Sequence, residues 1–219
     1  MKKVLVCIVC IVCVLTSCKS NQKSKIVGID TLTERVDALV KQYQDLDIFS
    51  GIVLIAENGN EKYHKAFGLA NRKTKEKNTI TSKFDIGSMN KSFTKTVILQ
   101  LLEEGKLEIN DTLGKYIQGF PKQASSKITI MHLLKHQSGY SEYWGNDFED
   151  LHIDQKRIPA LVERIKKTRL YFEPGTDVKY SNSGYVLLGA IIEKITEKTY
   201  HQNVVDRIIT PLKMTETYV

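Results

Sequence analysis

A serine and a lysine three residues apart have the residue types of an activated nucleophile. Ser88 directly follows Gly87, at the point where the apolar spacing of a helix begins, and Lys91 lies one turn further on. Residues three apart on a helix share a face, so the Lys91 amine can reach the Ser88 hydroxyl. An amine takes up a proton only when it is neutral, and burial or a nearby cation favours that form. The pair therefore predicts nucleophilic catalysis of the Ser-Lys type.

The S-x-x-K pattern alone is not specific, because it occurs three times, at Ser20–Lys23, Ser88–Lys91 and Ser92–Lys95. Ser20 lies in a polar N-terminal segment, and a serine within a helix, such as Ser92, tends to bond a backbone carbonyl. Only Ser88 stands at a glycine-to-helix junction, where the helix dipole and unpaired N–H groups favour a developing oxyanion. A plain helix-capping serine is the alternative at that position.

The elements that must position this pair are read from the apolar spacing. A helix is expected over 29–45, and a β-hairpin over 50–56 and 62–69 around the turn signal Asn58-Gly59. Further helices are expected over 92–104, which ends at Gly105, over 185–195 and over about 200–209, with short helices and loops between 105 and 170. This order predicts an α+β fold with the helices to one side of an antiparallel sheet. Two strands seldom make a stable sheet, so the sheet is expected to be incomplete.

Three segments carry a resemblance to a known family. They are FDIGSMNKSFTKTVILQLLEEGKLEINDTLGKYI, ITIMHLLKHQSGY and EPGTDVKYSNSGYVLLGAIIEKITEKTY. Over most of residues 45–218 the sequence resembles the serine β-lactamase-related family, which includes class C β-lactamases, D-Ala-D-Ala carboxypeptidases and related esterases. The resemblance implies a β-lactamase/transpeptidase-like fold. It also implies that Ser88 is the acylated nucleophile and Lys91 its proton partner.

A second motif of that family, Y-x-N, matches Tyr180-Ser181-Asn182. The resemblance implies that Tyr180 helps to shuttle the proton to the leaving group and that the Asn182 amide binds the acyl side of the substrate. A phenol beside a cationic lysine releases its proton more easily than in water, and an amide offers a donor and an acceptor without charge. The alternative is an ordinary polar loop between the Pro174-Gly175 turn and the helix expected from Tyr185.

The family's third motif, K-[ST]-G or H-x-G on a strand, does not occur after Asn182. In the family that strand supplies a second oxyanion donor, whose loss costs about 10² to 10³ in rate. We therefore expect a C-terminally truncated or partially sequenced member, with two of the three motifs, that is inactive as it stands and whose complete form is the enzyme.

The N-terminal residues predict export. Two lysines precede an apolar run from Val4 to Leu15, which is shorter than the roughly 20 residues of a membrane-spanning helix and is typical of a signal peptide. The segment Leu15-Thr16-Ser17-Cys18 resembles the lipobox of bacterial lipoproteins, in which the cysteine is lipidated. We expect a signal peptide over 1–17, a lipid on Cys18, a disordered tether over 18–28 and a partial hydrolase domain over 29–219. Cleavage of a plain signal peptide is the alternative.

Other ligand classes have weaker signals. All four cysteines lie within the first eighteen residues, so no disulfide framework or Cys-type zinc site is expected beyond them. The lysines are scattered among acidic residues, which disfavours nucleic-acid binding. His132 and His136 are four residues apart, a metal-ligand spacing, but no glutamate follows the first of them as in a zincin. Packing is favoured, and no metal or cofactor is expected. The aromatic loop 140–150, with Tyr143 and Trp144, lines a cleft or lies on the surface.

The sequence thus predicts an exported, lipid-anchored and monomeric serine hydrolase. Its acyl-enzyme would form on a β-lactam, a D-Ala-D-Ala peptide of peptidoglycan or a small ester, and the motifs do not separate these substrates. The alternative is a non-catalytic surface lipoprotein that binds cell-wall peptide or a partner protein.

Overall fold

The computed structural model describes residues 31–218 and divides the chain between Phe84 and Asp85 into two compact units. The signal peptide, Cys18 and the tether predicted from the sequence lie outside the described residues. Every residue named below as part of the candidate site belongs to the second unit.

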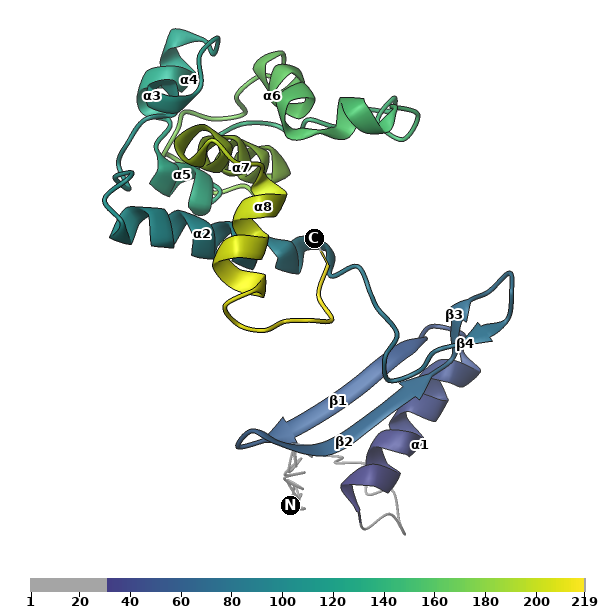
Figure 1. Ribbon diagram of the computed structural model, residues 1–219. Helices are drawn as coiled ribbons and strands as arrows, with labels where there is room; N and C mark the ends of the chain where they lie inside the picture. Colours follow the sequence, from purple (N-terminus) through teal and green to yellow (C-terminus); the bar gives the residue numbers. More distant parts are fainter. Residues whose placement is uncertain (1–30, 219) are drawn as a thin grey trace, which may run out of the picture. The chain divides into compact units, whose positions relative to one another are not determined.

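Over residues 31–84, the first unit consists of helix α1 and two small antiparallel sheets (Figure 1). Helix α1 (Leu32–Asp45) begins at a capping box formed by Thr31 and Glu34, one residue after the start of the described chain. Strands β1 (Gly51–Glu57) and β2 (Asn60–Phe67) pair from Gly51↔Phe67 to Glu57↔Asn60, which confirms the predicted hairpin. A second pair, β3 (Leu69–Asn71) and β4 (Glu76–Lys77), was not predicted because its strands are too short to show a pattern.

Polar contacts tie the hairpin to α1. The Tyr63 hydroxyl donates to Asp37 at 2.5 Å, and the Lys65 ammonium donates to the other oxygen of the same carboxylate at 2.7 Å. Burial and this carboxylate raise the pKa of Tyr63 to about 12, so its hydroxyl remains a donor. The turn between the strands places Asn58 and Gly59 at positive φ, 51° and 78°, as a turn of this composition requires.

The second unit is helical. It begins with a 3₁₀ turn, Gly87–Asn90, that continues into α2 (Lys91–Glu103). Then follow α3 (Leu113–Tyr116), α4 (Lys122–Lys127), α5 (Ile130–Leu134), a 3₁₀ turn over Ile153–Lys156, α6 (Ile158–Lys166), α7 (Asn182–Thr196), α8 (Tyr200–Val204) and a π-helical turn over Val205–Ile209.

Helix α7 is the centre of this unit and contacts α2, α5, α6 and α8 (Figure 1). Four of its apolar side chains have no exposed surface, namely Leu187, Leu188, Ile191 and Ile192. Each buried side chain of this size contributes about 1.5–3 kcal/mol through the hydrophobic effect. A helix buried on so many sides is a rigid support for whatever residues precede it.

Three predicted boundaries need correction. Helix α7 begins at Asn182 and not near Tyr185, because the Ser181 hydroxyl accepts from the Gly184 N–H and caps it there. The helix expected over 92–104 is shifted by one residue and is preceded by the 3₁₀ turn. The helix expected over 200–209 changes at Val205 into a π-helical turn. Within residues 31–218, no helix combines the length and apolar character needed to cross a membrane.

Candidate active site

Ser88 lies in the 3₁₀ turn and is exposed. The turn is shaped by Gly87, whose φ is 51°, and by the Asp85 carboxylate, which accepts from the Gly87 N–H at 2.7 Å. The N-cap of α2 is Asn90, and the hydroxyl of Ser88 hydrogen-bonds other side chains. The capping alternative for this serine is therefore wrong: its hydroxyl is directed at functional groups and not at the backbone.

The hydroxyl of Ser88 contacts two groups that could move its proton. Its Oγ lies 2.6 Å from the Tyr180 hydroxyl, and the Lys91 ammonium donates to it at 3.1 Å. The same ammonium donates to Oδ1 of Asn182 at 2.6 Å. The structure thus places Ser88, Lys91, Tyr180 and Asn182 in one hydrogen-bonded cluster, although two of them are about ninety residues from the others.

The cluster makes Tyr180 more acidic than an ordinary tyrosine. Hydrogen bonding to Lys91, then to Ser88, lowers the pKa of Tyr180, and the Lys91 charge acts in the same direction. The Lys91 nitrogen lies 4.9 Å from the centre of the Tyr180 ring. Burial and the Glu142 carboxylate oppose the shift without cancelling it. The phenolate form is thus stabilised next to the serine.

Asn182 is the first residue of α7, and Glu142 holds it in place. The Glu142 carboxylate oxygens accept from the Asn182 N–H at 3.0 and 3.1 Å, and Oε1 also lies 3.4 Å from the Asn182 side-chain nitrogen. A carboxylate at a helix N-terminus is favoured by the helix dipole. Because the Asn182 nitrogen is turned to Glu142, its oxygen is turned to Lys91.

His136 and Glu142 are site residues that sequence reasoning missed. Both belong to the segment after α5, and no local pattern connects that segment with residues 179–183. In the sequence, His136 has only a metal-ligand spacing from His132, for which packing is favoured, and Glu142 is one residue of the aromatic loop 140–150. The motif H-Q-S-G at 136–139 was the available signal, since Gly139 adopts a φ of 80° and marks a specific turn.

The two histidines do not form the pair that a shared helix face would give. Helix α5 ends at Leu134, and His136 has a φ of 58°, which removes it from the helical spacing. Nδ1 of His132 instead lies 3.4 Å from the Thr129 N–H in a capping box. In the part of the chain that the structure describes, no three His, Cys, Asp or Glu side chains gather in a way that could hold a metal ion.

A cavity of about 330 Å³ adjoins the cluster. Lys91 and Asn182 line it, together with Asn90, Thr94, Tyr143, Ile158, Tyr185, Val186, Gly189 and Tyr200. Of the two aromatic residues noted in loop 140–150, Tyr143 therefore lines a cavity. Trp144 is 44% exposed and packs edge-on against Tyr143. Of these two side chains, Tyr143 thus faces the cavity and Trp144 lies on the surface.

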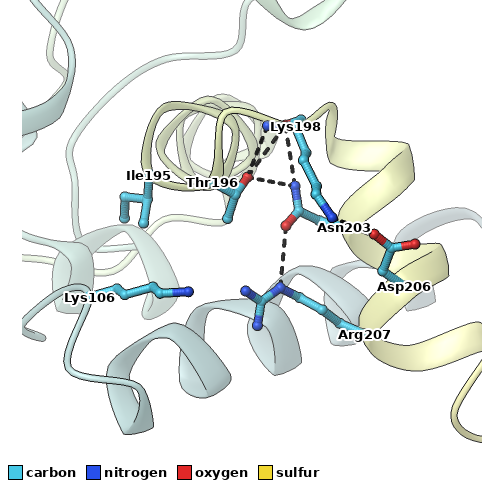
Figure 2. A pocket seen from close by; sticks show the side chains of 7 residues that line it. All are labelled: Lys106, Ile195, Thr196, Lys198, Asn203, Asp206 and Arg207. Carbon is cyan, nitrogen blue, oxygen red and sulfur yellow. Dashed lines mark hydrogen bonds and ion pairs between the residues drawn. The ribbon is translucent and has the colours of Figure 1, made fainter.

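A second cavity, of about 290 Å³, lies where α7 and α8 join (Figure 2). Asn203, which is 1% exposed, donates to the Thr196 hydroxyl and accepts from the Arg207 guanidinium. The cations around it have acidic partners: Lys198 pairs with Asp206, and Arg207 and Lys106 pair with Glu104. These contacts hold α8 against α7, and this cavity has a structural role.

The geometry can be compared with known proteins. The family model described as Beta-lactamase matches residues 36–219. The chain belongs to the beta-lactamase family. Penicillin-binding protein 4* of Bacillus subtilis is 38% identical over 176 residues, which are 78% of this chain and 38% of that protein. Teichoic acid D-alanine hydrolase of Staphylococcus aureus is 33% identical over 178 residues, which are 81% of this chain and 43% of that protein.

The crystal structure of FmtA from Staphylococcus aureus shows the same fold. It is 32% identical in sequence and aligns with a TM-score of 0.70. The alignment covers 82% of this chain and 49% of that chain. The β-lactamase/transpeptidase-like fold expected from the sequence is thereby confirmed, as is the relation to serine hydrolases of the β-lactamase and penicillin-binding type. The chain spans less than half the length of these relatives.

Proposed function

We propose that this chain is a serine hydrolase that acts on amide or ester bonds through an acyl-enzyme formed at Ser88. The observation that carries the proposal is the 2.6 Å contact between the Ser88 Oγ and the Tyr180 hydroxyl, within reach of the Lys91 ammonium. An exposed hydroxyl with a positioned proton acceptor is the basic requirement of nucleophilic catalysis.

The contacts support a particular route for the proton. Tyr180, whose pKa is lowered beside Lys91, accepts the Ser88 proton while Oγ forms a bond to the substrate carbonyl carbon. The tetrahedral intermediate then collapses, the carbon–nitrogen or carbon–oxygen bond to the leaving group breaks, and Tyr180 returns the proton to that group. Lys91 keeps its charge and is held by Asn182. Water then adds to the acyl-enzyme and restores the serine, with Tyr180 again acting as the base.

Two relatives support the proposed substrate class, since one is named a penicillin-binding protein and another a teichoic acid D-alanine hydrolase. We propose a β-lactam, a D-Ala-D-Ala peptide or a small ester.

The proposal for localisation rests on the N-terminal sequence, which suggests export and a membrane anchor through a lipid on Cys18. Incorporation of labelled palmitate into the wild type and not into Cys18→Ala would support the anchor, and an unlabelled wild type would exclude it.

Active-site labelling tests the enzymatic proposal. A fluorescent penicillin and a fluorophosphonate are each incubated with the chain, and the adduct is mapped by mass spectrometry. We expect an adduct on Ser88 and none in Ser88→Ala. Ser92→Ala is the matched control, because Ser92 belongs to the neighbouring S-x-x-K pattern and is exposed on α2. Equal labelling of Ser88→Ala would exclude Ser88 as the nucleophile, and absence of labelling with both probes would exclude acylation of this chain.

A further inference from the structure

His136 makes three contacts with the segment that carries Tyr180. Its backbone carbonyl accepts from the Lys179 N–H at 3.0 Å, and its Nδ1 accepts from the Ser181 N–H at 3.1 Å. Its ring stacks on that of Tyr180, with centroids 4.6 Å apart and an interplanar angle of 28°. The residues before and after the tyrosine are thus fixed by the backbone and by the side chain of one histidine, while its ring supports the phenol itself.

These contacts require one protonation state of the imidazole. Nδ1 can accept from the Ser181 N–H only if it carries no proton, so the proton of the neutral ring is on Nε2. Protonation of the ring would add a hydrogen to Nδ1. That hydrogen would face the Ser181 N–H, which Nδ1 now accepts from. The contact would become a repulsion between two donors, and the Ser181 N–H would lose its partner.

The surroundings favour the neutral ring. Lys91 and Lys95 approach His136 from α2, Glu142 from the loop after α5, and the Tyr180 and Tyr185 rings lie at 4.6 and 5.2 Å. Burial, followed by the two lysine charges, lowers the pKa of His136, and the Glu142 charge opposes this shift. The neutral imidazole is therefore favoured more strongly than in an ordinary histidine.

We propose that His136 is a positioning residue that holds Tyr180 against Ser88 while its imidazole is neutral, so that protonation of the ring withdraws the phenol from the nucleophile. The inference rests on the proposed function for its effect on acylation. Its geometric part, the coupling of His136 protonation to the placement of Tyr180, is independent of whether the chain is acylated.

Two substitutions separate the acceptor from the ring. In His136→Asn, the amide oxygen can take the place of Nδ1, and asparagine tolerates the φ of 58° better than most residues. This variant keeps the acceptor but cannot titrate. His136→Phe keeps an aromatic ring against Tyr180 and loses the acceptor. His201→Asn is the matched control, because His201 is exposed on α8.

The rate of fluorophosphonate acylation is measured between pH 4.5 and 8. At pH 7 we expect His136→Phe to be slower than wild type by about tenfold, the effect of one lost hydrogen bond, and His136→Asn to be within about threefold. The part of the acidic decline that follows the His136 midpoint should be absent in His136→Asn and present in His201→Asn. An unchanged decline in His136→Asn would overturn the proposal.

A measurement that needs no activity accompanies the kinetics. Nitrogen-15 NMR of the histidine rings reports the tautomer and midpoint of His136, and carbon-13 labelling of tyrosine Cζ reports the environment of Tyr180. We expect the Nε2–H tautomer at neutral pH and a Tyr180 signal that shifts with the His136 midpoint, but not in His136→Asn. If the wild type shows this coupling and is never acylated, the enzymatic proposal fails and the positioning role stands. If Tyr180 does not respond, the positioning role fails whatever the acylation rate.

Discussion

Glu142 offers a direct test of how the site is held at the start of α7. Its carboxylate accepts from the backbone N–H of Asn182 at 3.0 Å and approaches the side-chain nitrogen at 3.4 Å. A hydrogen bond to a charged group contributes about 1.5–3 kcal/mol, and a carboxylate at a helix N-terminus adds about 0.3–1 kcal/mol. Because Glu142 is only half-buried, we take the lower part of each of these two ranges and add them. Glu142→Ala should lower the free energy of unfolding by about 2 kcal/mol.

Glu142→Gln should cost about half as much, since the amide oxygen can still accept from the Asn182 N–H without the charge. Urea unfolding followed by circular dichroism measures both variants. Acylation by a fluorophosphonate should slow by about tenfold in Glu142→Ala, because the Asn182 amide is then free to rotate its oxygen away from Lys91. Glu149→Ala, an exposed glutamate of the same loop, is the control and should change neither quantity.

The alanine and glutamine variants also carry an electrostatic signature. The Glu142 charge opposes the lowering of the pKa of Tyr180, so Glu142→Gln should lower that pKa further and not raise it. An ultraviolet titration of tyrosine measures the shift. A Glu142→Ala protein with wild-type stability would refute the reasoning about the helix N-terminus. A Tyr180 pKa that rises in Glu142→Gln would refute the electrostatic part.

Two further predictions concern stability. Gly139 has a φ of 80°, and a Cβ there would lie 2.3 Å from the Phe172 carbonyl oxygen, so Gly139→Ala should lower the free energy of unfolding in urea by more than about 3 kcal/mol. The control is Gly119→Ala, where φ is 88° but only the flexible Lys166 side chain lies nearby, and this change should cost about 1–2 kcal/mol. Equal costs for the two variants would contradict the steric argument. Hydrogen bonding to Arg207 and then to Lys106 lowers the pKa of Glu104 from 4.5 to about 2. The stabilising effect of the Glu104 charge is therefore complete above pH 4.5 and is lost as the pH falls towards 2. The free energy of unfolding of Glu104→Gln should lack this part of the acid dependence, and parallel pH–stability curves for the two proteins would disprove the assignment.

The sequence by itself determined the local elements and the motif residues. Helices α1 and α2 and the β1–β2 hairpin follow from apolar periodicity and an Asn-Gly turn, signals that act over a few residues. Ser88 and Lys91 are three residues apart, so their proximity is a property of one helical turn. The Y-x-N motif is similarly local, and it pointed to Tyr180 and Asn182 without showing what they contact.

Only the tertiary structure decided how these residues are held. His136 and Glu142 come from the segment after α5, and they bind backbone groups of residues 181 and 182, about forty positions later in the chain. Apolar periodicity in the sequence does not predict such a contact, because any side chain with an acceptor atom can bind a backbone N–H if the fold brings the two together. The start of α7 at Asn182 has two origins: the Ser181 cap is local, whereas the Glu142 carboxylate acts only once the two segments are packed side by side.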